Sequence, residues 1–383
     1  MQRMKSLGLR DRIFLRDFEY KVVYNAEKDE LYEIDDEAFE FFLRCNGEHS
    51  YGELKKTYGD GVDYAISEGL IVEGYGKSEV FVPESPTPSL RYILIHITNK
   101  CNLKCRHCYI DKKGMDMDLN VFGRVIEEFY NMGGIKVMIT GGEPLLHPEV
   151  KEILRITANY GIRLELLTNG TVINEKNAEL IRKYVDEVQI SIDGVKGHDK
   201  LRGEWSLEKT LNGIKFLEGV DLSVATMITR FNRDEFDKIQ EIVSELGAKR
   251  WLLDYPCTDA EILLSLSDAA EIMRNYGYGR ESYASSLRKT CGTHLCSVTP
   301  EGLISRCGFY EDKPVGSIFD GLRKCWSRIC ARHLWDLEEL QCGCESIEDC
   351  KGGCRYRAEY FGNGKLGRDP FMCHYFSVVS NLE

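Results

Sequence analysis

Apolar and polar positions alternate with a period of two in three short stretches near the beginning of the chain. These stretches, 11–16, 20–25 and 30–34, are rich in β-branched and aromatic residues and are separated by turn-forming residues. Such alternation is typical of strands that bury one face. The pattern therefore predicts three short strands.

The spacing of apolar residues becomes helical immediately afterwards. An acidic pair at 35–36 precedes a segment over 37–45 in which Phe41 and Phe42 share one face, and Gly47 follows it. We expect a helix that the aspartates cap and that Gly47 ends. The other elements predicted in this region are helices over 51–58 and 62–67 and a strand over 70–72.

From 90 to 255 the chain alternates between apolar runs of strand length and segments with helical spacing. The predicted strands lie near 92–97, 136–140, 163–167, 187–192, 222–228 and 250–254. The predicted helices lie near 119–131, 148–160, 175–183, 206–217 and 233–246. Regular alternation predicts parallel strands with right-handed crossovers, and hence an α/β fold. Six strands in about 165 residues are too few for a full barrel of roughly 250, so we expect a partial (β/α)6 barrel of the TIM type, with function at the carboxyl ends of its strands.

The chain also divides into parts. Glycines at 74 and 76 and prolines at 83, 86 and 88 mark a linker before the alternating region, and ten of the fifteen cysteines lie after position 290. The predicted parts are an N-terminal domain over 1–80, a core over 81–256, a connecting segment over 257–290 and a cysteine-rich domain over 291–383.

Composition and charge narrow the functional classes. A chain of 383 residues with 43% apolar composition can pack two or three domains. The net charge of −12 argues against a nucleic-acid-binding surface. No apolar run is long enough to span a bilayer, and residues 1–10 are not followed by the apolar segment of a secretory signal. We expect a cytoplasmic protein without membrane or nucleic-acid partners, in which fifteen cysteines indicate metal ligation rather than disulfides.

Three cysteines lie within eight residues, directly after the first predicted strand of the core: Cys101, Cys105 and Cys108. Such thiolates can bind three irons of a [4Fe–4S] cluster and leave the fourth iron open to a small molecule. The alternatives are a zinc site without its fourth ligand, or thiols that are merely buried. The spacing C-x3-C-x2-C, followed by Tyr109, resembles the radical S-adenosylmethionine (SAM) superfamily, in which SAM binds the open iron.

Several strand ends resemble the SAM-binding segments of that superfamily. A Gly-Gly-Glu-Pro segment over 141–144 follows the second strand, and the resemblance implies that it binds the SAM ammonium, with Glu143 as the carboxylate partner. Polar residues after the third and fourth strands resemble positions near the SAM ribose and carboxylate. The implied SAM-binding residues are Gly141, Gly142, Glu143, Pro144, Asn169, Ser191, Asp193 and Arg202. An ordinary turn at 141–144 and a solvated charge at Arg202 are the alternatives.

The late cysteines resemble the SPASM domain, which holds two auxiliary [4Fe–4S] clusters. The resemblance assigns Cys291, Cys296, Cys307 and Cys354 to the first cluster and Cys342, Cys344, Cys350 and Cys373 to the second. One residue rather than two separates Cys342 from Cys344, which requires a tight turn that Gly343 permits. Zinc knuckles are the alternative. We expect Cys325 and Cys330 to be structural.

The order of strands and helices over 1–80 resembles PqqD-like domains, which are winged-helix-like and recognise peptides. In that family a leader peptide adds a strand to the sheet edge and lies against the third helix. The alternatives are a winged helix for DNA and a structural cap. Acidic residues over 27–40 disfavour DNA.

The resemblances together imply a radical SAM enzyme that cleaves SAM reductively and modifies a ribosomally made peptide bearing a leader, with ferredoxin or flavodoxin as electron donor. The product would be a cross-link, a thioether or a related oxidation. Asp254, at the end of the sixth strand, and Cys257, which follows it, are candidates for substrate contact or proton relay, or form a turn with a buried thiol.

Three other functions stay open. Haem-biosynthesis enzymes that modify tetrapyrroles share the core. Sulfatase maturases also share it, but carry Asp where this chain has Gly308, directly after Cys307. An iron–sulfur electron carrier is disfavoured, because the Gly-Gly-Glu-Pro segment would have no purpose there.

Overall fold

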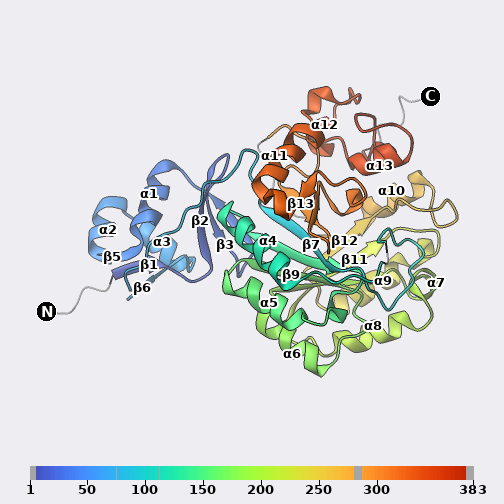
Figure 1. Ribbon diagram of the computed structural model, residues 1–383, viewed down its shortest axis with the longest axis horizontal. Coiled ribbons are helices and arrows are strands. Elements are labelled where there is room, and N and C mark those ends of the chain that lie inside the picture. Colours follow the sequence, from blue (N-terminus) through green and yellow to red (C-terminus); the bar gives the residue numbers. More distant parts are fainter. Residues whose placement is uncertain (1–5, 75, 112, 280–286, 377–383) are drawn as a thin grey trace.

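The computed structural model describes residues 6–74, 76–111, 113–279 and 287–376. Figure 1 shows an N-terminal cap in blue beside a larger body, in which helices cover a central sheet coloured from teal to yellow. The C-terminal part, in orange and red, packs on the same body.

The cap contains the three predicted strands and the three predicted helices. The strands are β2 (Ile13–Asp17), β3 (Lys21–Asn25) and β4 (Glu30–Glu33), which form an antiparallel sheet in that order. The helices are α1 (Asp36–Arg44), α2 (Tyr51–Tyr58) and α3 (Gly61–Ser67). Asp35 caps α1, as predicted, by accepting a 2.8 Å hydrogen bond from the backbone of Ala38.

A second sheet in the cap was predicted only in part. It consists of β1 (Ser6–Leu9), β5 (Asn46–Ser50) and β6 (Ile71–Glu73), in the order β5-β1-β6. Gly47 not only follows α1 but lies within β5 at φ 80°, where a Cβ would come within 2.3 Å of the Gly76 carbonyl oxygen. Backbone pairing to β1 makes this strand, so its polar side chains give no alternating signal.

The body is built on six parallel strands that follow one another in the sheet in chain order, which confirms the predicted β/α alternation. They are β7 (Tyr92–Thr98), β8 (Lys136–Gly141), β9 (Arg163–Thr168), β10 (Glu187–Ser191), β11 (Asp221–Met227) and β12 (Arg250–Asp254). The helices between them are α4 (Leu119–Asn131), α5 (Val150–Asn159), α6 (Glu175–Tyr184), α7 (Lys196–Arg202), α8 (Ser206–Ile214) and α9 (Phe236–Glu245). Ile95 and Val137 are completely buried, as expected of strands covered on both faces.

The C-terminal part continues the same sheet, which the sequence pattern did not predict. β13 (Leu295–Val298) pairs in parallel with β7, and β14 (Leu303–Ser305) and β15 (Gly316–Ser317) follow in antiparallel order. The remaining helices are α10 (Leu266–Asn275), α11 (Leu322–His333), α12 (Ile347–Cys350), α13 (Arg355–Tyr360) and α14 (Pro370–Tyr375). α10 falls in the expected connecting segment and contacts α14, where Arg274 donates to the His374 carbonyl at 2.9 Å.

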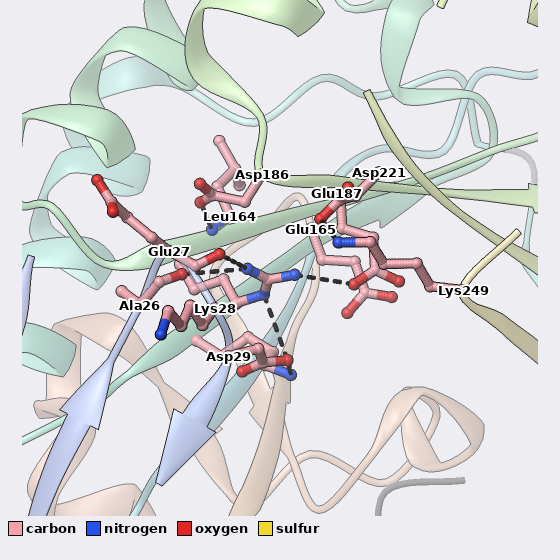
Figure 2. Close-up of polar contacts among 12 residues, drawn as sticks. Ala26, Glu27, Lys28, Asp29, Leu164, Glu165, Asp186, Glu187, Asp221 and Lys249 are labelled. Atoms are coloured by element: carbon pink, nitrogen blue, oxygen red, sulfur yellow. Dashed lines mark hydrogen bonds and ion pairs between the residues drawn. The ribbon is translucent and has the colours of Figure 1, made fainter. Parts of the chain in front are cut away.

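Buried charges attach the cap to the amino ends of the core strands (Figure 2). The β3–β4 turn brings Asp29 to within 3.3 Å of the Arg163 guanidinium and into an ion pair with Lys136. Although burial opposes ionisation, these two cations hold the pKa of Asp29 at about 2. Arg12 adds two 2.7 Å hydrogen bonds to Asp186. The opposite edge of the sheet, at the carboxyl ends, is left for the candidate site.

Candidate functional site

A cavity of about 460 Å³ lies at the carboxyl ends of the core strands, where the β/α pattern predicted function. The loop after β7 contributes Cys101, Cys105, His107, Cys108, Tyr109 and Ile110 to its wall. The other lining residues are Thr140, Gly141, Gly142, Leu167, Thr168, Asn169, Gln189, Ser191, Arg202, Ala225, Thr226, Met227, Leu252, Leu253 and Asp254. The structure thus brings the three thiols of the triad to one cavity.

The turn after β8 holds the cysteine loop in place. The backbone of Gly142 donates to the Thr98 carbonyl, and that of Glu143 donates to the Lys100 carbonyl, each at 2.8 Å. A Cβ on Gly142 would lie 2.2 Å from the Lys100 carbonyl oxygen, so only glycine allows this approach. The Gly-Gly-Glu segment therefore positions the backbone immediately before Cys101.

Glu143 is not among the residues that line the cavity, so its expected role as a partner of the SAM ammonium stays a prediction. Its carboxylate is completely buried and accepts hydrogen bonds from Thr168 Oγ1 at 2.7 Å and from the backbone of Asn169 at 2.9 Å. Burial raises the pKa of Glu143, and these hydrogen bonds oppose the increase. Its oxygens join the ends of β8 and β9. Pro144, also buried, begins the short turn that follows and is likewise absent from the cavity wall.

The other expected SAM-binding residues divide into two groups. Asn169, Ser191 and Arg202 line the cavity with Gly141 and Gly142. Asp193 does not; it is fully buried and pairs with Arg202. Although burial opposes ionisation, the guanidinium holds the pKa of Asp193 below its usual value. Asp193 therefore acts on the site by orienting Arg202.

Of the two candidates at and after the end of the sixth strand, Asp254 and Cys257, only Asp254 lines the cavity. Its carboxylate accepts a 3.1 Å hydrogen bond from Arg357 of α13. Burial raises the pKa of the Cys257 thiol to about 12, and Cys257 is not part of the cavity wall. The structure thus gives Cys257 the surroundings of a protonated structural thiol.

Sequence reasoning missed several residues of the wall. The polar residues Thr140 and Gln189 line it from β8 and β10, and the apolar Met227 lines it from the end of β11. Gln189 and Ser191 are two positions apart on the same strand, as residues on one face must be. Because alternate residues of a strand share a face, the predicted site residue Ser191 already indicated that Gln189, two positions earlier, faces the same cavity.

The thiols of the expected second auxiliary set are gathered together. The backbone of Cys344 donates to the Cys342 carbonyl at 2.8 Å, which is the tight turn expected from the one-residue spacing. Burial raises the pKa of Cys350 to about 12, and neighbouring Cys373, Cys344 and Cys342 contribute to the increase. All four members of this set are therefore neighbours.

The structure brings three thiols of the expected first auxiliary set together and places the fourth elsewhere. Burial raises the pKa of Cys354, and its neighbour Cys291 raises it further. Cys291 also raises the pKa of Cys307, so these three thiols are neighbours. Cys296 instead lies on β13 with its side chain completely buried in the hydrophobic core. Its side chain belongs to the inward face of the strand, where its thiol neighbours are Cys325 and Cys330.

Among the described residues, no three His, Cys, Asp or Glu side chains converge closely enough to hold a single metal ion. The described helices also include none that is long and apolar enough to cross a membrane.

Comparison with known proteins identifies the core. Residues 95–246 match the Radical SAM superfamily, so the chain carries a radical SAM domain. A domain of this superfamily implies a [4Fe–4S] cluster and SAM. The three cysteines on one loop fit the cluster, because three thiolates at one cavity leave an iron open toward it.

Relatives with quite different names share this core. An AdoMet-dependent heme synthase of Oleidesulfovibrio alaskensis is 26% identical over 348 residues, which cover 76% of this chain and 89% of that protein. The antilisterial bacteriocin subtilosin biosynthesis protein AlbA of Bacillus subtilis is 24% identical over 378 residues, which cover 86% of this chain and 82% of that protein. Streptococcus suis SuiB, solved bound to its precursor peptide SuiA, has a similar fold: its TM-score is 0.70 at 13% identity, over 95% of this chain and 98% of that one.

Proposed function

We propose that this chain, whose residues 95–246 form a radical SAM domain, modifies a ribosomally synthesised peptide that it recognises through its N-terminal cap. In this proposal the core is a partial (β/α)6 barrel, the cap is a PqqD-like domain and the C-terminal part is a SPASM domain. One observation carries the choice of a peptide: the cap has an apolar groove beside an edge strand, β4, which among the described strands pairs with β3 alone.

The groove has a volume of about 420 Å³ and lies between β4, α1 and α3. Ile34, Phe41, Tyr64 and Leu70 are among the apolar side chains that line it. β4 is the last strand of its sheet and is paired, among the described strands, only with β3. An extended peptide can add to such an edge through its backbone and place alternate side chains in the groove.

The charge of the groove indicates what kind of peptide it would take. Glu33, Asp35 and Glu37 belong to its wall, together with the apolar side chains. Opposite charges favour encounter and correct register more than they add affinity. A leader with apolar residues at alternate positions and a basic residue nearby would fit this surface.

In the core, Cys101, Cys105 and Cys108 would hold the cluster, and SAM would occupy the cavity beside them. When bound, these groups supply a 5′-deoxyadenosyl radical that removes a hydrogen atom from the substrate. The chain's own residues orient SAM and exclude water: Arg202 offers a cation for its carboxylate, Asn169 and Ser191 offer hydrogen bonds, and Gly141 and Gly142 leave room for its approach.

The late cysteines would hold auxiliary iron–sulfur clusters. Cys342, Cys344, Cys350 and Cys373 form a complete set of four thiols, whereas Cys291, Cys307 and Cys354 form a set of three. Such groups can accept an electron when a peptide is oxidised. Ferredoxin or flavodoxin would supply the electron that starts the reaction.

Tetrapyrrole oxidation is a second candidate, because the matched relatives include AdoMet-dependent heme synthases. These matches cover 75–76% of this chain, less than the 86% covered by AlbA. Tetrapyrrole oxidation would also give the groove of the cap no role, whereas peptide modification uses it.

One experiment distinguishes the two candidates. The reconstituted full-length protein is incubated with SAM and dithionite, and either with the peptide encoded by a short reading frame beside its gene or with a porphyrin substrate. We expect 5′-deoxyadenosine and a mass change in the peptide alone. A change in the porphyrin alone would assign the protein to tetrapyrrole chemistry.

A further inference from the structure

A second, smaller hollow adjoins the cavity of about 460 Å³ at the carboxyl ends of the core strands, which we call the cofactor cavity. Its volume is about 210 Å³, and it lies between the loop after β7 and the turn after Cys307. Tyr109 and Ile110 line both spaces, so the two meet at this pair of residues. We call this smaller hollow the side chamber.

The side chamber contains a buried histidine next to a carboxylate. His96 lies on β7 and is 1% exposed, and its Nε2 is 3.0 Å from Oε1 of Glu311. Among the residues that the structure describes, neither nitrogen of His96 finds a partner with hydrogen-bond geometry, and Oε1 of Glu311 does not either. Leaving buried polar atoms unsatisfied is unfavourable, so a purely structural role would not explain this pair.

His147 shows what a structural histidine looks like in the same protein. It is 2% exposed, its Nε2 lies 3.0 Å from the Met117 carbonyl oxygen, and its Nδ1 accepts from the backbone of Glu149 at 3.1 Å. Both of its nitrogens are therefore used by the fold. His96 is buried to the same extent, but neither of its nitrogens has a hydrogen-bond partner among the described residues, and Nε2 lies beside the Glu311 carboxylate.

The backbone leaves room for a substrate group beside His96. A Cβ on Gly308 would lie 3.3 Å from His96 Nε2 and 3.1 Å from the hydroxyl oxygen of Tyr109. Any larger residue at this position would fill the space in front of the imidazole. Glycine at 308 thus keeps His96 accessible from the side chamber.

We propose that His96, held by Glu311, accepts the proton that is released when the bound peptide is oxidised. This inference rests on the proposed peptide-modifying function. Oxidation of a C–H and X–H pair removes two hydrogens: the 5′-deoxyadenosyl radical takes one hydrogen atom, one electron passes to an iron–sulfur acceptor, and one proton goes to the imidazole of His96, whose Nε2 faces Glu311. The Glu311 carboxylate stabilises the imidazolium that forms.

Other titratable groups of the side chamber are poorer acceptors. Asp111, Lys113 and Asp312 are exposed, and Lys113 pairs with Asp111 at 3.0 Å. Glu301, Tyr109 and Tyr356 also line the space. Among these groups, His96 is the nearly fully buried base that has a carboxylate oxygen within 3.0 Å of its ring.

The test separates SAM cleavage from peptide oxidation in the reconstituted enzyme. We expect His96→Gln to lower formation of the modified peptide by about 100-fold, while formation of 5′-deoxyadenosine from SAM and dithionite alone stays within twofold of the parent. We expect Glu311→Gln to lower peptide modification by about tenfold. It should also move the acidic limb of the pH–rate profile to lower pH, because the imidazolium loses its counter-charge.

A readout independent of turnover comes from deuterium exchange at the imidazole C2 position of His96, followed by mass spectrometry as a function of pH. Glu311→Gln should shift its midpoint in the same direction as the rate profile. Asp312→Asn, in the same chamber but exposed, is the matched control and should change none of these quantities.

The outcomes are distinguishable. If the parent modifies the peptide and His96→Gln does so within threefold of it, this inference is overturned and the proposed function stands. If both variants lose SAM cleavage together with peptide oxidation, the pair has a structural role and the inference is overturned. A parent that modifies no peptide overturns the proposed function and this inference together.

Discussion

Arg357 of α13 donates a 3.1 Å hydrogen bond to Asp254, the last residue of β12. The same guanidinium binds Asp369 through several hydrogen bonds of 2.9–3.0 Å, and Asp369 caps α14, which carries Cys373. A single side chain thus connects the wall of the cofactor cavity to the cysteine-rich part. The arrangement fixes the distance between the two parts without a covalent link.

Removing that connection should be costly. Asp369 is 2% exposed, and Arg357→Gln would leave its carboxylate buried without a counter-charge. We expect a loss of about 3–5 kcal/mol in the free energy of unfolding, measured by urea denaturation of the reconstituted protein. Arg328→Gln, which breaks an exposed pair with Asp320, is the control and should cost no more than about 1 kcal/mol. Equal effects of the two changes would contradict this role for Arg357.

Replacing Cys101, Cys105 and Cys108 together with alanine should remove roughly four irons and abolish reductive SAM cleavage. The late cysteines should keep their iron, because they lie in a different part of the molecule. Iron analysis and chromatography of 5′-deoxyadenosine provide the measurements. Continued formation of 5′-deoxyadenosine at the parental rate would disprove the assignment of the triad.

The burial of Cys296 gives a second iron prediction. Cys296→Ala should retain the full iron content, since this thiol lies in the hydrophobic core, whereas Cys307→Ala should lose iron and peptide turnover while SAM cleavage persists. The two variants differ only in which thiol is removed, so each controls for the other. Loss of iron in Cys296→Ala would restore it to the first auxiliary set.

The cap groove can be tested by substitution. Tyr64 lines it and is 56% exposed, so Tyr64→Glu should disturb the fold little while repelling an apolar peptide. We expect binding of the leader to weaken about tenfold, measured by fluorescence anisotropy, with SAM cleavage unchanged. Tyr360→Glu, also exposed but distant from the groove, is the control. Deleting the cap would be less informative, because it would leave Lys136 and Arg163 without their partner Asp29.

The buried ion pairs that join Glu165 and Glu187 to Arg163 and Arg250 predict a pH dependence of stability. Burial and the neighbouring Glu187 raise the pKa of Glu165 to about 7, above the ordinary value of 4.5. Between these pH values the folded protein keeps the proton that the unfolded chain has lost, so the contribution of Glu165 to stability falls as pH rises through this window. Glu165→Gln should remove that decrease, as measured by thermal unfolding at a series of pH values. Glu152→Gln, at an exposed site, should leave it unchanged.

Much of this protein is determined by its sequence alone. Strand and helix positions in the core follow from apolar periodicity, because strands buried on both faces must be continuously apolar. The cysteine triad could be recognised because its ligands are adjacent in the chain. The same holds for the turn at Cys342 and Cys344, because a single residue separates the two thiols.

Only the tertiary structure decided which side chains face one another. Cys296 has the right spacing for a ligand, yet the register of β13 turns it into the core. Glu143 has the right chemistry for SAM, yet hydrogen bonds from β9 occupy it. His96 and Glu311 are 215 positions apart, and only the pairing of β13 beside β7 brings the turn that carries Glu311 to the histidine. Local patterns determine elements, whereas contacts between distant elements depend on packing that no local pattern encodes.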